Sequence, residues 1–158
     1  MAEENQQPAQ QFAVQRIYVK DISFETPQGP EVFRQTWKPH VNLEINTRNV
    51  RIDDNNFEVV LTLSVTVSME EKTAFLAEVQ QAGIFFVSGI ADLQLRQVLG
   101  TVCPNLLFPY AREAIDNLVV RGSFPPLMLA PVNFDALYAQ ALKQAQEKAQ
   151  AEQAGTAH

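Results

Sequence analysis

Histidine, cysteine and carboxylate side chains could do chemistry in this sequence, and few of them stand together. His40 follows a proline, and His158 is the last residue. A transition-metal site needs several nitrogen, sulfur or oxygen ligands at close spacing. No second histidine or cysteine lies near either histidine, so we expect no metal site.

A nucleophilic site has as little support. A Ser/His/Asp arrangement would have to use His40, and no GxSxG motif accompanies it. The glycines are scattered and build no phosphate-binding loop. Cys103, the only cysteine, lies among apolar residues before a proline, which is typical of a buried structural thiol. We expect no catalytic residue, no cofactor and no enzyme activity.

Three carboxylates deserve separate attention, because Asp21, Glu25 and Glu78 lie on strand-like segments whose faces could bring them together. An acid/base pair needs surroundings that separate the two pKa values, and the sequence shows none. Two interpretations remain open. The carboxylates form a solvated acidic face, which the residues alone favour, or a docking patch for a basic partner with Leu76 as its apolar companion.

Composition narrows the classes of function. Hydrophobic residues make up 46% of the chain and charged residues 19%, which excludes global disorder. The net charge of -6 argues against a nucleic-acid binder, which needs a basic patch. No apolar run approaches the roughly 20 residues that cross a bilayer, and the N-terminus has no signal-peptide pattern. We expect a cytoplasmic protein without membrane insertion.

The elements that position these side chains begin with strands. An extended pattern starts at Phe12, and its imperfect alternation predicts a bulge or a half-exposed edge strand. A proline-rich connection, Thr26–Pro39, carries Phe33 and Trp37, which either pin the loop or form a lid over a groove. Alternating apolar and polar residues then predict strands at 41–46 and 57–68 and a fourth strand at 75–79, which Gly83 ends or bends.

Helical spacing begins after Gly89, is interrupted at Cys103–Pro109, and resumes until Gly122. An extended apolar strap, Ser123–Val132, follows, and Asn133 is a suitable N-cap for a final helix. The predicted fold is α+β: a four-stranded, meander-like antiparallel sheet, with a long crossover loop after the first strand and C-terminal helices packed on one face. We expect a mobile arm at 1–11, a single domain at 12–142 and a polar, disordered tail at 143–158.

Apolar residues are densest between Cys103 and Tyr138, in excess of one buried helix stripe. Such a surplus suits an oligomer interface, a groove for apolar ligands, or both.

Four stretches of the chain resemble the SecB family of bacterial protein-export chaperones. They are QRIYVKDISFE (15–25), FLAEVQQAGIF (75–85), CPNLLFPYARE (103–113) and SFPPLMLAPVNFDALY (123–138), and the resemblance runs in order from about Phe12 to Leu142.

The resemblance implies a homotetramer, a dimer of dimers, that has no ATPase activity. It would hold unfolded precursor proteins in the cytoplasm and pass them to the SecA motor. The family's SecA-docking positions correspond to Asp21, Glu25, Leu76 and Glu78, and its assembly positions to Ala77, Val79 and Gln81. Candidates for the client groove are Trp37, Val41, Leu43, Ile45, Phe75 and Tyr110.

The alternative is an oligomeric α+β enzyme with an apolar pocket, such as a hotdog-like thioesterase. That class needs a long central helix wrapped by a sheet, together with a catalytic carboxylate. The interrupted helix at Cys103–Pro109 and the unpaired carboxylates count against it.

Overall fold

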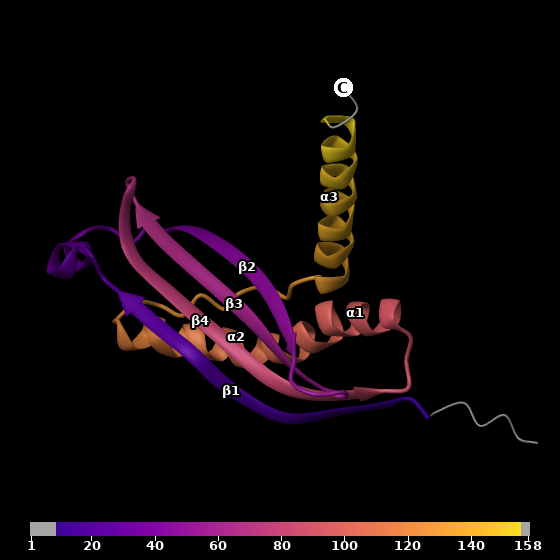
Figure 1. The fold of residues 1–158 in the computed structure, drawn as a ribbon. Coiled ribbons are helices and arrows are strands. Elements are labelled where there is room, and N and C mark those ends of the chain that lie inside the picture. Colours follow the sequence, from indigo (N-terminus) through magenta and orange to yellow (C-terminus); the bar gives the residue numbers. More distant parts are fainter. Residues whose placement is uncertain (1–8, 156–158) are drawn as a thin grey trace, which may run out of the picture.

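Segments in which apolar and polar residues alternate form an antiparallel sheet of four strands (Figure 1). The computed structural model of the protein describes residues 9–155. The strands are β1 (Gln11–Glu25), β2 (His40–Arg51), β3 (Asn56–Met69) and β4 (Lys72–Ser88). Their spatial order is β1-β4-β3-β2, so β2 to β4 form a meander. The connection after β1, which contains the short 3-10 helix η1 (Gly29–Arg34), carries the chain to the opposite edge of the sheet. This confirms the predicted sheet and its long crossover.

The two faces of the sheet differ in polarity. In β3 every second residue from Phe57 to Val67 is buried on the face that helices cover. The intervening residues, including Glu58, Thr62 and Ser64, lie on the uncovered face, hereafter the open face. This period of two is what a strand with one covered face requires.

An irregularity in β1 decides which of its residues reach the open face. The pairing of β1 with β4 shifts register between Val14 and Arg16 and again between Val19 and Asp21. At the second shift Lys20 is the extra residue, which confirms the predicted bulge. Before Lys20 the even-numbered Tyr18 shares the open face, and after it the odd-numbered Asp21 does.

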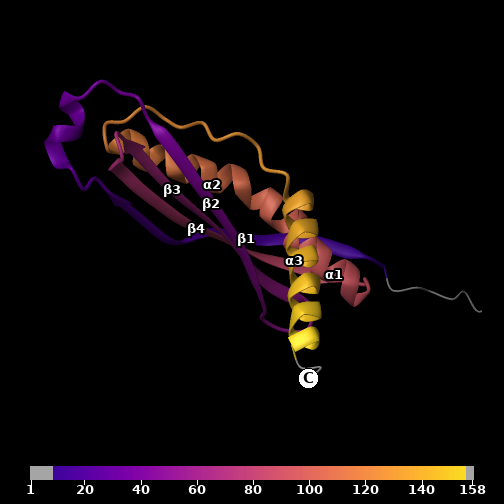
Figure 2. The ribbon, with the colours of Figure 1, turned by 90° about the horizontal axis from the view of Figure 1, so that it is seen from above.

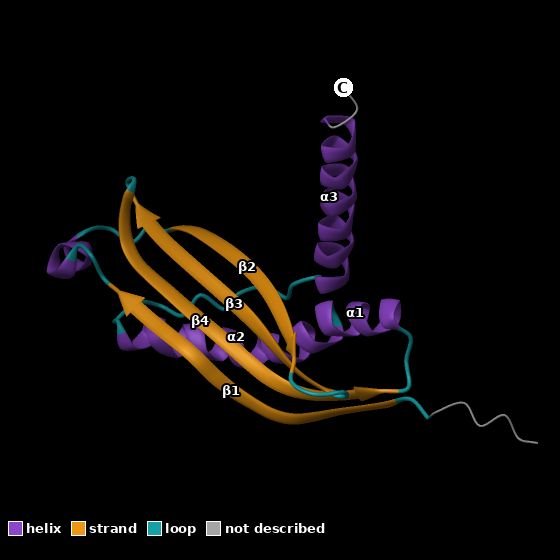
Figure 3. Ribbon diagram, in the orientation of Figure 1, coloured by secondary structure: helices purple, strands orange, loops and turns teal. Residues whose placement is uncertain are grey.

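Three helices follow the sheet: α1 (Asp92–Gly100), α2 (Val102–Arg121) and α3 (Phe134–Gly155). Figure 3 shows α2 lying along one face of the sheet, and its residues Leu107, Ala111, Ile115 and Val119 belong to the core. The core therefore lies between α2 and the covered faces of β3 and β4.

The predicted interruption at Cys103–Pro109 is wrong, because α2 is continuous through both prolines. Pro104 lies in the first helical turn, where a missing N–H removes no helical hydrogen bond. Pro109 lies inside the helix and cannot bond to the carbonyl of Asn105. Asn105 is exposed, so water can reach that carbonyl instead.

The final helix also differs from the expectation. We expected a disordered tail at 143–158, but α3 remains helical to Gly155. Alanine, glutamine, glutamate and lysine favour helix, and the side-chain oxygen of Asn133 accepts the N–H of Ala136 at 3.0 Å, as the predicted cap requires. Figures 1 and 2 show α3 standing off the sheet beside α1.

A glycine fixes the contact between α1 and α3. A Cβ atom at Gly100 would lie 2.6 Å from the Tyr138 ring, so only glycine permits this approach. Most of the expected arm at 1–11 lies outside the described residues, and β1 already begins at Gln11. No helix between residues 9 and 155 is long and apolar enough to cross a membrane.

Candidate functional site

The register of β1 against β4 brings the four candidate docking residues onto one face. Glu25 pairs with Leu76, Ser23 with Glu78, and Asp21 with Gln80. Directly paired residues of antiparallel strands point to the same side. The carboxylates of Asp21, Glu25 and Glu78 therefore share the open face with Leu76, which is 36% exposed. Glu25 lies opposite Leu76, Glu78 lies two residues further along β4, and Asp21 lies in the row of Gln80.

This acidic group lacks cationic partners. Glu78 accepts a hydrogen bond from the hydroxyl of Ser64 at 3.0 Å. Within residues 9–155, no ion pair involves Asp21, Glu25 or Glu78. Unpaired carboxylates around a half-exposed leucine form a surface that a basic, partly apolar partner would complement.

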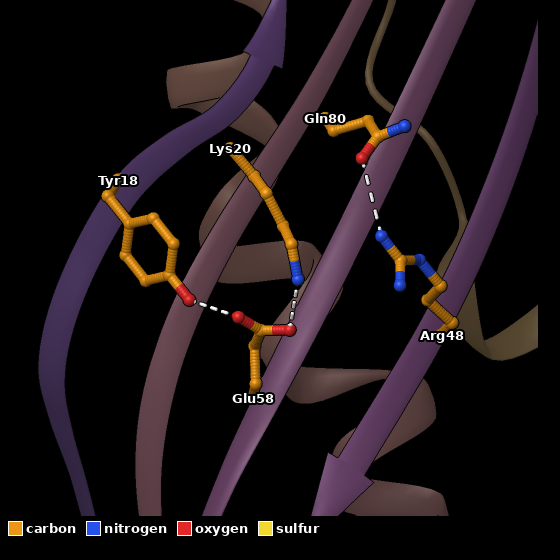
Figure 4. Close-up of polar contacts among 5 residues, drawn as sticks. All are labelled: Tyr18, Lys20, Arg48, Glu58 and Gln80. Atoms are coloured by element: carbon orange, nitrogen blue, oxygen red, sulfur yellow. Dashed lines mark hydrogen bonds and ion pairs between the residues drawn. The ribbon is translucent and has the colours of Figure 1, made fainter.

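A second polar group lies on the same face, and sequence reasoning missed it (Figure 4). The Tyr18 hydroxyl and the Lys20 ammonium both donate to the carboxylate of Glu58, the ammonium at 2.7 Å. The hydrogen bonds from Lys20 and Tyr18 lower the pKa of Glu58. Burial and the neighbouring Glu58 raise the pKa of Tyr18 to about 12. Tyr18 and Lys20 belong to β1 and Glu58 to β3, so the contact spans β4.

Small residues make this bridge possible. Tyr18 lies opposite Ala82, Ala82 opposite Val60, and Val60 opposite Arg48, which gives one row across the sheet. Ala82 and Val60 are buried although they belong to the open face. Long side chains can therefore lie over them.

Aromatic residues gather at the end of the sheet where β1 ends. Phe124 of the strap contacts Phe75 at a centroid distance of 4.7 Å, Phe33 at 5.3 Å and Trp37 at 5.5 Å. Phe24 stacks on Phe75 at 5.5 Å. These contacts favour the interpretation that Phe33 and Trp37 pin the connection after β1 onto the body.

The edge strand β2 carries an apolar row beside this aromatic group. Val41, Leu43 and Ile45 pair with buried residues of β3 and so share the covered face. Leu43, Ile45 and the neighbouring Trp37 are only partly buried, and 42% of Val41 is exposed. We call Trp37, Val41, Leu43 and Ile45 the β2 groove.

At one end of the β2 groove, Ile45 lines a cleft. Asp116 of α2 accepts the backbone N–H of Leu127 at 2.9 Å, which holds the strap against α2. In Figure 2 the strap runs back along α2 on the side away from β1. A cleft of about 380 Å³ opens where Ile45 and Thr47 face Leu137 and Tyr138 of α3.

Two predicted groove residues lie elsewhere. Phe75 is fully buried inside the aromatic group, so it supports the groove from within. Tyr110 is 49% exposed and lines a separate shallow pocket with Ile17 and Val19 of β1, the opposite edge strand. The structure does not bring Tyr110 together with the β2 groove.

The three candidate assembly residues lie under α2. Ala77, Val79 and Gln81 are buried on the covered face of β4. The side-chain amide of Gln81 donates to the carbonyl of Tyr18 at 3.1 Å, next to the bulge in β1. Because these side chains are buried, a substitution at one of the three positions could affect an intersubunit surface only by altering the packing of β1 or α2.

The described part of the chain holds neither a candidate metal cluster nor a reactive thiol. Among residues 9–155, no cluster of three or more His, Cys, Asp or Glu could hold a metal ion. Cys103 is buried, and burial raises the pKa of its thiol to about 12. A thiol in such surroundings is a poor nucleophile near neutral pH.

Comparison with known proteins finds relatives over nearly the whole chain. A family model described as preprotein translocase subunit SecB matches residues 3–145. The protein-export protein SecB of Marinobacter nauticus is 60% identical over 94% of this chain and 94% of its own length. That of Hahella chejuensis is 59% identical over 97% of this chain and 96% of its own length.

A solved structure is similar in fold. The SecB-like chaperone of Mycobacterium tuberculosis, solved in complex with a ChAD peptide from an antitoxin, has a TM-score of 0.61 at 17% identity, over 77% of this chain and 90% of that chain. Since the family match spans nearly the whole sequence and the relatives are about 60% identical, this chain belongs to the SecB family.

Proposed function

We propose that the protein is an ATP-independent chaperone that binds unfolded precursor proteins in the cytoplasm, keeps them competent for export and delivers them to SecA. One observation carries this proposal. The acidic group around Leu76 and the apolar β2 groove lie on opposite faces of one sheet. Client and docking partner can therefore occupy the protein at the same time.

The β2 groove suits an unfolded chain. Such a chain exposes short apolar segments, whereas a folded protein hides them. Ordering one segment costs conformational entropy, so a single groove binds weakly. Several grooves in one assembly make the later contacts intramolecular, at an effective concentration on the order of mM for short linkers. Retention then needs neither nucleotide nor a specific sequence.

The open face suits the delivery step. Its carboxylates attract a basic partner, and Leu76 supplies the apolar contact that a docking surface needs at its centre. We assign Asp21, Glu25, Leu76 and Glu78 to SecA docking. SecA bound there does not cover the β2 groove, so the client can stay in the groove until it is transferred.

Two outward surfaces support a homotetramer. β1 is an edge strand of 15 residues without proline, and an unpaired edge of this length is a template for another chain. Apolar residues are exposed along β1 and on the outer side of α2: Phe12, Val14, Val19, Ile22, Val102, Leu106, Tyr110 and Val120. Two different interfaces per chain give a dimer of dimers. We place Ala77, Val79 and Gln81 behind these interfaces, where they set the packing of α2 on β4.

The enzyme alternative has no support. Helix α2 is long and continuous, as a hotdog-like fold requires. However, the carboxylates of Asp21, Glu25 and Glu78 lie on the open face and not in an apolar pocket, and the relatives are named protein-export proteins.

Suppression of aggregation tests the proposal. A slow-folding precursor is diluted from denaturant with the protein at increasing ratio, without nucleotide, and light scattering is recorded. Scattering should fall to baseline near one assembly per client. Addition of SecA with membranes and ATP should then make the client protease-resistant inside vesicles. Unchanged scattering at excess protein would refute the holding function.

A further inference from the structure

The bulge in β1 places a cation next to a carboxylate on the part of the open face that carries Asp21, Glu25, Leu76 and Glu78, hereafter the docking face. Because Lys20 is the extra residue between Val19 and Asp21, two consecutive residues reach the open face. One is a candidate docking carboxylate, Asp21, and the other is a cation. A lysine beside Asp21 could neutralise it and would repel a basic partner.

The structure holds that lysine elsewhere. The Lys20 ammonium lies 2.7 Å from Oε1 of Glu58, and 38% of the lysine and 18% of the glutamate side chain are exposed. Glu58 lies four residues along β3 from Thr62, the residue in line with Gln80 and Asp21. At about 3.3 Å per residue, the Cα atom of Glu58 lies roughly 13 Å along β3 from that row. The Lys20 side chain is therefore directed along the sheet, away from the row that contains Asp21.

Tyr18 holds in place the Glu58 carboxylate that accepts the hydrogen bond from Lys20. Its hydroxyl donates to Oε2 of Glu58, so both carboxylate oxygens have partners from β1 (Figure 4). A carboxylate held from both sides has one preferred rotamer, and less side-chain entropy is lost when Lys20 binds. The lowered pKa of Glu58 agrees with a carboxylate that stays ionised beside the ammonium.

We propose that Glu58 is a positioning residue of the docking face: it holds the Lys20 ammonium away from Asp21 and so keeps the acidic group free for a basic partner. This inference rests on the proposed docking function. It adds Glu58, and Tyr18 that holds it, to the residues on which docking depends, although Glu58 lies on a strand that contributes no docking residue.

Four proteins test the proposal: the wild type, E58Q, K20Q and the double variant E58Q/K20Q. Glutamine keeps the shape of Glu58 and an acceptor for Tyr18 but removes the charge that holds Lys20. The affinity for full-length SecA is measured by calorimetry at low salt. E31Q is the matched control, because Glu31 also forms an ion pair, with Arg34 at 3.5 Å, but lies in η1 outside the sheet.

We expect E58Q to weaken SecA binding by about three-fold, the effect of one exposed charge contact, and E31Q to leave it unchanged. K20Q should bind at least as tightly as the wild type, and E58Q/K20Q should return to within about 1.5-fold of it, because no ammonium then remains to be held. Rescue in the double variant is a result that general loss of structure cannot give.

Three results would overturn the role of Glu58: wild-type affinity in E58Q, no rescue in E58Q/K20Q, or weaker binding in K20Q. The double reversal D21K/E25K separates this failure from failure of the docking function. If D21K/E25K binds SecA normally, the docking face itself is wrong and the role of Glu58 falls with it. If D21K/E25K loses binding while E58Q does not, only the role of Glu58 is wrong.

Discussion

Glu25, the last residue of β1, lies directly opposite Leu76 near the start of β4. The two residues belong to distant parts of the sequence, and the crossover after β1 is what allows them to meet, because it leaves β1 free to pair with the last strand. The acidic group is therefore a product of the topology. Opposite pairs of this kind explain why the proposed docking residues come from two short, separate stretches.

Charge reversal should separate docking from holding. D21K/E25K places cations where a basic partner expects carboxylates, and like charges across an interface are strongly unfavourable. We expect at least about 30-fold weaker SecA binding, or roughly 2 kcal/mol, with unchanged suppression of client aggregation. E31K/D92K, at exposed acidic sites away from the open face, is the control. Equal loss of both activities in D21K/E25K would contradict a separate docking face.

Two valines of β2 offer a matched test of the β2 groove. Val41 is 42% exposed on the covered face and Val50 is 55% exposed on the open face. V41N should weaken binding of an unfolded client about five-fold, because roughly 1 kcal/mol of apolar burial is lost. V50N should bind the client like the wild type. Equal client affinities of V41N and V50N would remove β2 from the client site.

Assembly should be visible in the molar mass. Since both β1 and α2 expose apolar residues, light scattering at micromolar concentration should give a mass near four chains. V19K, on the exposed edge strand, should lower that mass by placing a charge in the proposed contact. A monomeric wild type would contradict the mechanism that relies on several grooves.

The single cysteine reports on folding. Burial raises the pKa of Cys103 to about 12, so the native thiol is protonated at pH 8 and should not react with a disulfide reagent. Unfolding in guanidinium restores an ordinary thiol, and one group per chain should then react. The neutral thiol favours the folded state fully below the ordinary pKa of about 8.5, and this preference is lost as pH rises towards 12. Rapid reaction of the native protein would contradict the buried position.

Sequence reasoning located the strands because the apolar residues of β3 recur at every second position from Phe57 to Val67, and it located the bulge because those of β1 do not. It also placed the cap at Asn133 correctly. It failed at α2 because two prolines close together usually end a helix, and the sequence cannot show that Asn105, whose carbonyl Pro109 leaves without a helical partner, is exposed. It failed at the tail because helix propensity alone gives no stable helix, whereas Phe134 is anchored in the core.

The arrangement of the candidate site was harder to predict. A strand pattern assigns Asp21 and Glu78 to faces but not to neighbours, because the spatial order of the strands is not encoded locally. Phe75 looked like a groove residue because it is aromatic, and it is core because Phe124 of the strap covers it. The bond from Tyr18 to Glu58 crosses an intervening strand, so no pattern within one segment could indicate it.

Binding of one polypeptide in two states tests the central claim most directly. A fluorescently labelled protein that is stable in its folded form is paired with a variant of it that stays unfolded in buffer, and the anisotropy of each is titrated with this chaperone without nucleotide. The unfolded form should bind with submicromolar affinity, as expected for several weak contacts acting together, and the folded form should not bind. Equal affinity for both forms, or a requirement for ATP, would contradict the account.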